Sequence, residues 1–192
     1  MLIKFIEIGM ERNEALNLVK ENVSNKNLVK HMIAVEAIMR GLAERLDKDP
    51  EEWGLIGLLH DIDFDKTKDD PKSHSVVAAE MLKGKIDDEK IRVIKSHNFE
   101  HTGFMPEKNI DYALIAADAV SGLVIAAALV IPSKKLADVK AESIGKRYKE
   151  KDFARNCSRE NMLFCEKLGI TKEEFFELSL KALQGISAEL GL

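Results

Sequence analysis

Apolar residues recur along most of the chain at the three-and-four spacing of amphipathic helices. The clearest stripe, in residues 28–46, consists of Leu28, Met32, Val35, Ile38, Met39, Leu42 and Leu46. A second helix is expected from Pro50 to the pair His60-Asp61, because Asp49 is a favourable N-cap and proline suits the first helical turn. The sequence lacks sustained period-two alternation and the Asn-Gly and Asp-Gly turns of hairpins. The pattern therefore predicts an all-α fold.

Two shorter helices are predicted next. A polar, proline-containing loop covers residues 63–73 and ends at Ser73, the expected N-cap of a helix that begins at His74. This helix should end at Gly84, since glycine readily adopts the left-handed conformation of a helix C-cap. Another helix is expected over residues 88–97, followed by a loop that contains glycine and proline.

A long apolar helix is predicted for residues 110–131. Its stretch 113–131 is almost entirely apolar and approaches the roughly 20 residues that a membrane span needs. Asp118 lies inside it, however, and an ionisable side chain at membrane depth is costly. We therefore expect the central helix of a bundle and no membrane association. Further on, Thr171-Lys172-Glu173-Glu174 has the form of a capping box and predicts a last amphipathic helix.

Charge, the N-terminal sequence and cysteine content argue against several classes of protein. The 192 residues include 29 basic and 33 acidic side chains, so no global field draws the chain to nucleic acid. The first residues do not have the form of a secretory signal, and we expect a cytoplasmic protein. Cys157 and Cys165 are spaced for neither a metal knuckle nor a redox pair, which predicts two reduced thiols.

Asp118 is the first candidate for chemistry. A carboxylate inside an apolar helix needs a cation or a strong partner if it is to stay ionised and buried, and no Arg or Lys lies within one helical turn of it. His31 lies on the first apolar stripe and His60-Asp61 closes the second helix, where each imidazole is either a hydrogen-bonded core residue or a metal ligand. Imidazole and carboxylate ligands together suit divalent iron, manganese, zinc, cobalt or nickel.

The order of these residues resembles the H…HD…D signature of the HD-domain metal-dependent phosphohydrolases, and the sequence from Leu58 to Ile62 is similar to its core motif. The chain length and the absence of a low-complexity linker predict a single domain, 1–192. The resemblance implies a helical bundle with its metal-binding core at about 28–129, which leaves a helical extension at about 133–192. It implies that one divalent metal ion is bound by His31, His60, Asp61 and Asp118. Asp63 stands where the usual motif has glycine.

Some branches of the family carry two further histidines that bind a second metal ion, with the motif aspartate, here Asp61, bridging the two ions. His74 and His97 occupy the corresponding places in this sequence. The alternatives are a polar residue in a first helical turn for His74 and a cation at a helix C-terminus for His97. The resemblance is thus compatible with either one or two bound metal ions, and magnesium is a further candidate metal.

The activity that the resemblance implies is hydrolysis of a phosphate ester, with a nucleotide or a related small molecule as substrate. Asp61 would be catalytic as a metal ligand, Asp63 would handle a proton, and Lys66 would neutralise the phosphate. Two other classes stay open: a metal-stabilised binding or regulatory module without turnover, and a di-iron oxygenase that uses the same ligands.

The remaining candidates for substrate contact are His101 and the basic residues of the last third. The segments that we single out are Ser133-Lys134-Lys135 and residues 151–155, while Lys146, Arg147, Lys149 and Arg159 suit a solvated face as well. The apolar side of the last helix could form a homodimer face.

Overall fold

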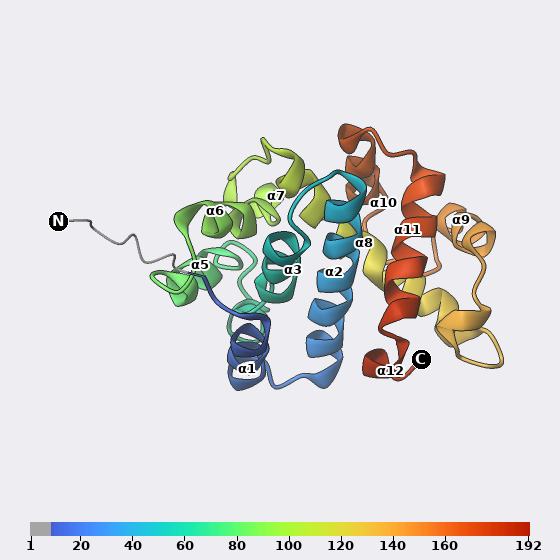
Figure 1. Cartoon of the computed structure of the whole chain (residues 1–192), viewed down its shortest axis with the longest axis horizontal. Coiled ribbons are helices and arrows are strands. Elements are labelled where there is room, and N and C mark those ends of the chain that lie inside the picture. The colour runs from blue at the N-terminus through green and yellow to red at the C-terminus, as the bar shows by residue number, and fades with distance from the viewer. Residues whose placement is uncertain (1–8) are drawn as a thin grey trace.

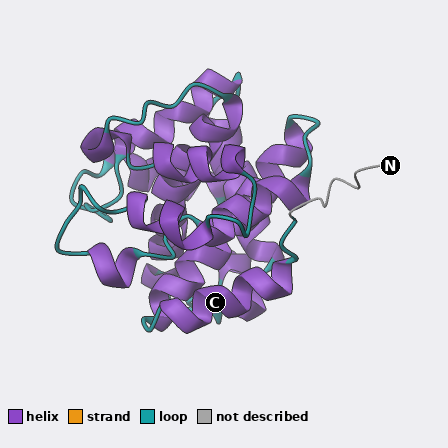
Figure 2. Cartoon of the chain, turned by 90° about the vertical axis from the view of Figure 1, so that its left-hand side faces the viewer, coloured by secondary structure: helices purple, strands orange, loops and turns teal. Residues whose placement is uncertain are grey.

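Three helices form the centre of the fold: the long helices α2 (Lys26–Arg45) and α8 (Asn109–Val130), and the shorter α3 (Pro50–Leu59). The computed structural model describes residues 9–192. Figure 1 shows α2 and α3 side by side, and Figure 2 shows a molecule built from helices and loops. Within residues 9–192 the only β-type pairing is an isolated bridge between Lys83 and Ile86. The predicted all-α fold is confirmed.

Helix α3 is apolar on all sides and is buried accordingly, from Trp53 to Leu59. Asp49 caps it by accepting hydrogen bonds from the backbone N–H groups of Glu51 and Glu52, as predicted. A Cβ atom built on Gly57 would lie 3.0 Å from backbone atoms of Glu36 in α2. The absence of a side chain at Gly57 therefore allows α2 and α3 to pack closely.

Helix α8 is long and apolar enough to cross a membrane by composition alone, and no other helix of residues 9–192 is. Most of its side chains are buried in the protein core, where α8 contacts α2, α6 and the C-terminal helices. Such burial identifies it as a core helix, as the position of Asp118 predicts.

The first helix, α1 (Arg12–Asn22), is not predicted by the apolar pattern, since only Ala15 and Val19 are buried on it. It packs against α3. The guanidinium of Arg12 binds the buried carboxylate of Glu36 at 2.6 Å, which links α1 to α2.

Four short helices follow α3 in the chain: α4 (Phe64–Thr67), α5 (Val76–Leu82), α6 (Asp88–Ser96) and α7 (Phe99–Thr102). Of these, α6 packs on α3 and α8, while α5 and α7 pack on α6. The predicted start of the second of these is wrong: α5 begins after Ser75, which has a positive φ of 68°, and Ser73 does not cap it. Hydrogen bonds from the backbone at the start of α5 to Asp63 explain this start. The left-handed conformation of Gly84 after α5 is confirmed, with φ of 74°.

The C-terminal third wraps the bundle with η1 (Leu136–Asp138), α9 (Ala141–Lys149), α10 (Arg159–Met162), η2 (Leu163–Leu168), α11 (Lys172–Gly185) and α12 (Ser187–Leu190). Helix α11 packs on α2, α8 and α9 (Figure 1). Thr171 caps α11 through the N–H of Glu174, but the Glu174 carboxylate pairs with Arg45 at 2.6 Å. The predicted capping box is therefore only half formed.

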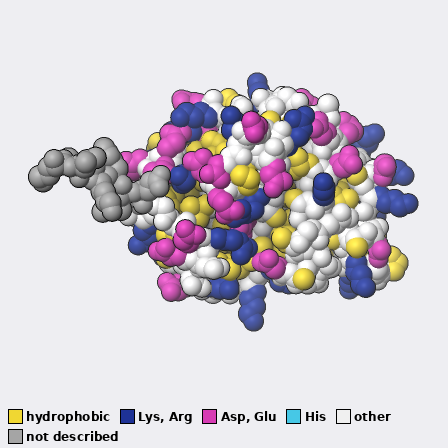
Figure 3. Space-filling model, viewed as in Figure 1, with side chains coloured by type: hydrophobic (Ala, Val, Ile, Leu, Met, Phe, Trp, Pro, Cys, Tyr) yellow, Lys and Arg dark blue, Asp and Glu magenta, His cyan; other side chains and the backbone are white. Residues whose placement is uncertain are grey.

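The surface carries both signs of charge. On the face shown in Figure 3, basic and acidic side chains are interspersed and neither sign forms a large patch. The two cysteines are free thiols, as predicted.

Candidate metal centre

Four of the predicted metal ligands meet where the C-terminal end of α3 faces α2 and α8. The Nε2 atom of His31 lies 3.1 Å from Asp118 Oδ1 and 3.7 Å from Asp61 Oδ2. The Nε2 atom of His60 lies 3.4 Å from Asp61 Oδ1 and 3.8 Å from Asp118 Oδ1. Residues up to 87 positions apart in the sequence are thereby brought to one point.

The other two predicted ligands adjoin the same aspartate. His74 Nε2 lies 3.2 Å and His97 Nε2 3.4 Å from Asp61 Oδ1, and the two imidazole nitrogens lie 3.0 Å apart. Ligand atoms of His31, His60 and Asp118 form one group that could hold a metal ion, and those of His60, Asp61 and His97 form a second. Asp61 is thus located between the two halves of the centre.

All four imidazoles point Nε2 into the centre and Nδ1 away from it. Nδ1 of His60 lies 2.8 Å from Gly57 O, and Nδ1 of His97 contacts Ile94 O. A carbonyl oxygen only accepts hydrogen bonds, so each Nδ1 carries the proton and each Nε2 is left to face the centre.

Side chains hold the other two rings. His31 Nδ1 lies 3.0 Å from Ser121 Oγ, whose own hydrogen goes to Asp118 O, and His74 Nδ1 lies 3.0 Å from Asp63 Oδ1. Such partners on the outer nitrogen are typical of metal-binding histidines. Ser121 is not among the predicted site residues, although its position three residues after Asp118 on one helix is a signal for it.

The carboxylates and imidazoles of the centre shift one another's pKa values. Burial disfavours a charge on the His60 ring, but the carboxylates of Asp61 and Asp118 outweigh this and raise its pKa to about 9. Burial likewise works against the charged form of Asp61, yet the neighbouring histidines hold the pKa of that carboxyl well below its usual range. The pKa of Asp118 is lowered in the same way by His31 and His60.

A divalent metal ion fits these residues. Nε2 of His60 is fully buried and has no hydrogen-bond partner in the part of the chain that the structure describes, an arrangement that is costly unless another species binds the nitrogen. Imidazole nitrogens and carboxylate oxygens form a donor set that suits borderline divalent ions. The side chains of Asp118 and His31 are 38% and 24% exposed, so the centre can be reached from solvent on this side.

Comparison with known families agrees with this geometry. The HD domain family matches residues 28–123, which is half of the chain and includes all six predicted metal ligands. The chain belongs to the HD domain family. Most HD domain proteins are metal-dependent phosphohydrolases, which supports the predicted class of protein. No solved structure matches the chain.

Asp63 and Lys66, which were predicted to act on the substrate, do not face the metal centre in the way that this role requires. Asp63 is fully buried, and its carboxylate accepts hydrogen bonds from His74 and from the backbone of Ser75 and Ala78. Lys66 points away from the HD centre, with Nζ 3.0 Å from Asn22 Oδ1 at the end of α1. The structure therefore does not bring either side chain to the exposed edge of the centre.

The remaining candidates lie outside the histidine cluster. His101 is exposed on α7, and its Nδ1 contacts Asn98 Oδ1. Arg159 donates hydrogen bonds to backbone carbonyls, including those of Ala154 and Cys157 at 2.9 Å, and so organises the loop of residues 150–158. Lys134 and Lys135 are exposed in the turn that follows α8.

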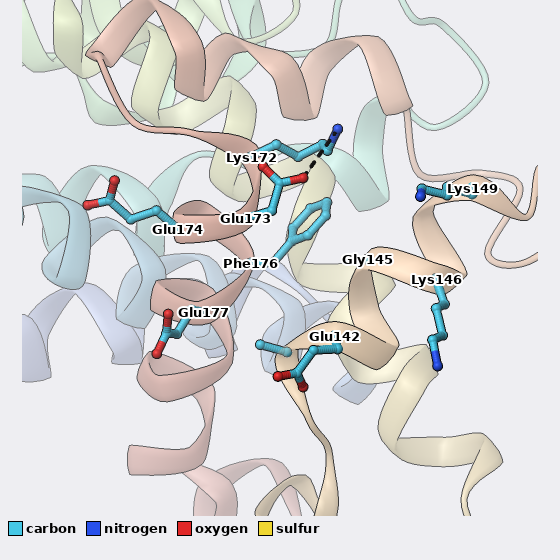
Figure 4. Close-up of a pocket in the computed structure, with 10 residues that line it drawn as sticks. Glu142, Gly145, Lys146, Lys149, Lys172, Glu173, Glu174, Phe176 and Glu177 are labelled. Carbon is cyan, nitrogen blue, oxygen red and sulfur yellow. Dashed lines mark ion pairs between the residues drawn. The ribbon is translucent and has the colours of Figure 1, made fainter.

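A groove of about 450 Å³ lies between α9 and α11. Figure 4 shows Phe176 pointing from α11 towards α9, with Lys146 and Lys149 on the α9 side. None of the six predicted metal ligands lines this groove. The groove is therefore separate from the candidate metal centre.

Proposed function

We propose that this HD domain protein is a metal-dependent hydrolase of phosphate esters, with a nucleotide or a related small phosphorylated molecule as substrate. The observation that carries the proposal is the convergence of four imidazole Nε2 atoms on the carboxylates of Asp61 and Asp118. His31, His60, Asp61 and Asp118 would hold one ion. Asp61, His74 and His97 would hold a second.

A divalent ion bound there supplies the Lewis acidity that polarises a phosphoryl oxygen and brings the pKa of water towards neutrality. The protein holds the ligand side chains in position. Each histidine is held through Nδ1, and Asp61 directs one oxygen towards His31 and the other towards His60, His74 and His97. Because these contacts exist before substrate arrives, little reorganisation is needed during the reaction.

Substrate reaches the centre at its exposed edge, beside Asp118. A Cβ atom built on Gly122, one turn after Asp118 on α8, would lie 2.7 Å from Cys157 Sγ. The loop of residues 150–158 is therefore next to this edge. Its exposed basic residues, Lys151 and Arg155, supply positive charge for the anionic substrate.

The proposed substrate is a small molecule in the cytoplasm. The nearly balanced charge of the chain, and the mixture of basic and acidic side chains on the face shown in Figure 3, argue against nucleic acid or an anionic membrane as a partner. The buried position of α8 is also that of a core helix.

Phosphate release from a panel of nucleotides and simple aryl phosphates, with each of manganese, iron, cobalt, nickel, zinc and magnesium, tests the proposal. We expect turnover with at least one metal, and a loss of at least about 100-fold in kcat/KM for Asp118→Asn, because an amide replaces a ligand carboxylate.

Asp69→Asn is the matched control, since this carboxylate is exposed in the loop after the HD motif and contacts no part of the centre. Its activity should equal that of the wild type. Absence of phosphate release under every condition would contradict the proposal, and oxygen consumption by iron-loaded protein would favour an oxygenase instead.

A further inference from the structure

Asp63 carries a buried carboxylate that the proposed hydrolysis does not use. Its side chain has no solvent exposure, and no Lys or Arg of residues 9–192 is bonded to it. A buried carboxylate without hydrogen bonds would be strongly destabilising, so the groups that bind it are informative. They all belong to the segment from His74 to Ala78.

The two oxygens of Asp63 have separate partners. Oδ2 accepts hydrogen bonds from the backbone N–H of Ser75 at 2.9 Å and of Ala78 at 3.0 Å, and thereby caps the start of α5. Oδ1 lies 3.0 Å from Nδ1 of His74. One oxygen thus holds the backbone before α5, while the other holds the imidazole.

The segment around His74 needs this support. Ser75 has a positive φ of 68°, a left-handed conformation that is unfavourable for a residue with a side chain. Asn98, next to His97, also supports it by donating a hydrogen bond to His74 O at 2.9 Å. The strained backbone turns His74 inward, so that Nε2 lies 3.2 Å from Asp61 Oδ1.

We propose that Asp63 is a positioning residue that builds the His74 half of the metal centre. It fixes the proton of His74 on Nδ1, directs Nε2 at Asp61, and stabilises the left-handed turn at Ser75. This inference rests on the proposed function, because it requires a second metal ion that is bound by Asp61, His74 and His97. Glycine at position 63, as in the usual motif, could supply none of these contacts.

The substitution Asp63→Asn separates the two roles. The amide oxygen can take the place of Oδ2 and keep both backbone hydrogen bonds. The amide nitrogen then faces His74 Nδ1, where it donates instead of accepting, and the ring proton moves to Nε2. A protonated Nε2 cannot bind a metal ion, although the fold around it is retained.

Equilibrium dialysis against manganese, with electron paramagnetic resonance of the bound Mn(II), measures the effect. We expect two ions in the wild type with the spectrum of a coupled pair, and a single-ion spectrum in Asp63→Asn with the second affinity weakened by about 10- to 100-fold. His74→Gln should give the same single-ion spectrum. Asp65→Asn is the matched control, because Asp65 Oδ2 also accepts two hydrogen bonds, from the N–H and hydroxyl of Ser24.

Amide hydrogen exchange provides a readout that does not depend on metal. The N–H groups of Ser75 and Ala78 should stay protected in Asp63→Asn and exchange faster in Asp63→Ala, which removes both acceptors.

A coupled pair with wild-type affinity in Asp63→Asn overturns the inference and leaves the proposed function standing. One ion in an active wild type also overturns it, because His74 then has no second ion to hold. A wild type that binds no ion overturns the inference together with the proposed function.

Discussion

Ser121 shows how much of the centre depends on residues that are not ligands. Its buried hydroxyl accepts from His31 Nδ1 and donates to Asp118 O, so it ties the two ends of the predicted first metal site together. His31 and Ser121 are 90 residues apart, and no local pattern in the sequence links them. Asp63 is a similar case, because its role is visible only once its partners are known.

Ser121→Ala should weaken binding of the first ion by about 10- to 100-fold while the protein stays folded. The substitution leaves His31 Nδ1 without its acceptor, and the ring is then free to rotate. Isothermal titration with manganese measures the affinity. The control is Ser179→Ala, because Ser179 is equally buried and its hydroxyl has no hydrogen-bond partner within residues 9–192.

Unchanged manganese affinity in Ser121→Ala would contradict this role. Ser179→Ala should keep the affinity of the wild type and lose no stability, since it removes a polar group that makes no hydrogen bond.

The metal-free protein should lose stability as the pH rises from 6.5 to 9. Despite burial, which disfavours the charged rings, nearby carboxylates raise the pKa of His60 to about 9 and that of His74 to about 10, from 6.5. Above pH 6.5 these two imidazoles keep their protons in the folded protein but lose them in the unfolded chain. Their contribution to the free energy of unfolding is therefore fully present below pH 6.5 and is lost as the pH rises towards the folded-state pKa values.

Urea denaturation in the presence of a chelator measures this dependence. The free energy of unfolding should fall by about 1.4 kcal/mol per pH unit for each such histidine. A free energy of unfolding that rises between pH 6.5 and 9 would show that the carboxylates do not hold these protons.

The helices that carry the ligands are those with the clearest sequence patterns. The apolar stripe of α2, the Asp49-Pro50 start of α3 and the apolar run of α8 predict three elements that the structure contains. Helix α1 escapes prediction because few of its residues are buried. The start of α5 is mispredicted because a carboxylate 12 residues before Ser75 determines it.

Gly57→Ala should destabilise the protein by about 1–3 kcal/mol, because the new Cβ would press on the backbone of α2 at Glu36. Gly145→Ala in α9 is the matched control, because a Cβ there meets no atom of the described residues within 4 Å. Since alanine favours helix, it should stabilise by about 0.5–1 kcal/mol. Thermal or urea denaturation of both variants measures these changes, and equal effects would contradict the close contact of α2 and α3.

Arg155→Ala should raise KM by about three- to tenfold with little change in kcat, because an exposed charge beside the centre contributes to uniform binding of an anion. Lys149→Ala is the matched control, since Lys149 lines the groove between α9 and α11 (Figure 4). Steady-state kinetics with the best phosphate ester of the panel measures KM and kcat for both variants. Identical KM values in the two variants would remove the 150–158 loop from substrate recognition.

Taken over the whole chain, the sequence predicts the helical class and the residues that come together, but not how they are held. His31, His60, Asp61 and Asp118 are recognisable because buried histidines and a carboxylate in an apolar helix require a partner. The backbone acceptors Gly57 O and Ile94 O carry no signature in the side chains, so the inward direction of Nε2 is visible only in three dimensions. The actual positions of Asp63 and Lys66 likewise follow from tertiary contacts.

Anomalous X-ray diffraction from crystals soaked with manganese tests the central claim most directly. The proposed function predicts two peaks on either side of Asp61, one beside His31, His60 and Asp118 and the other beside His74 and His97. In His97→Gln the second peak should vanish, whereas His101→Gln should keep both. Absence of any peak at these residues in the wild type, with manganese bound elsewhere or not at all, would contradict the claim that this cluster is a metal centre.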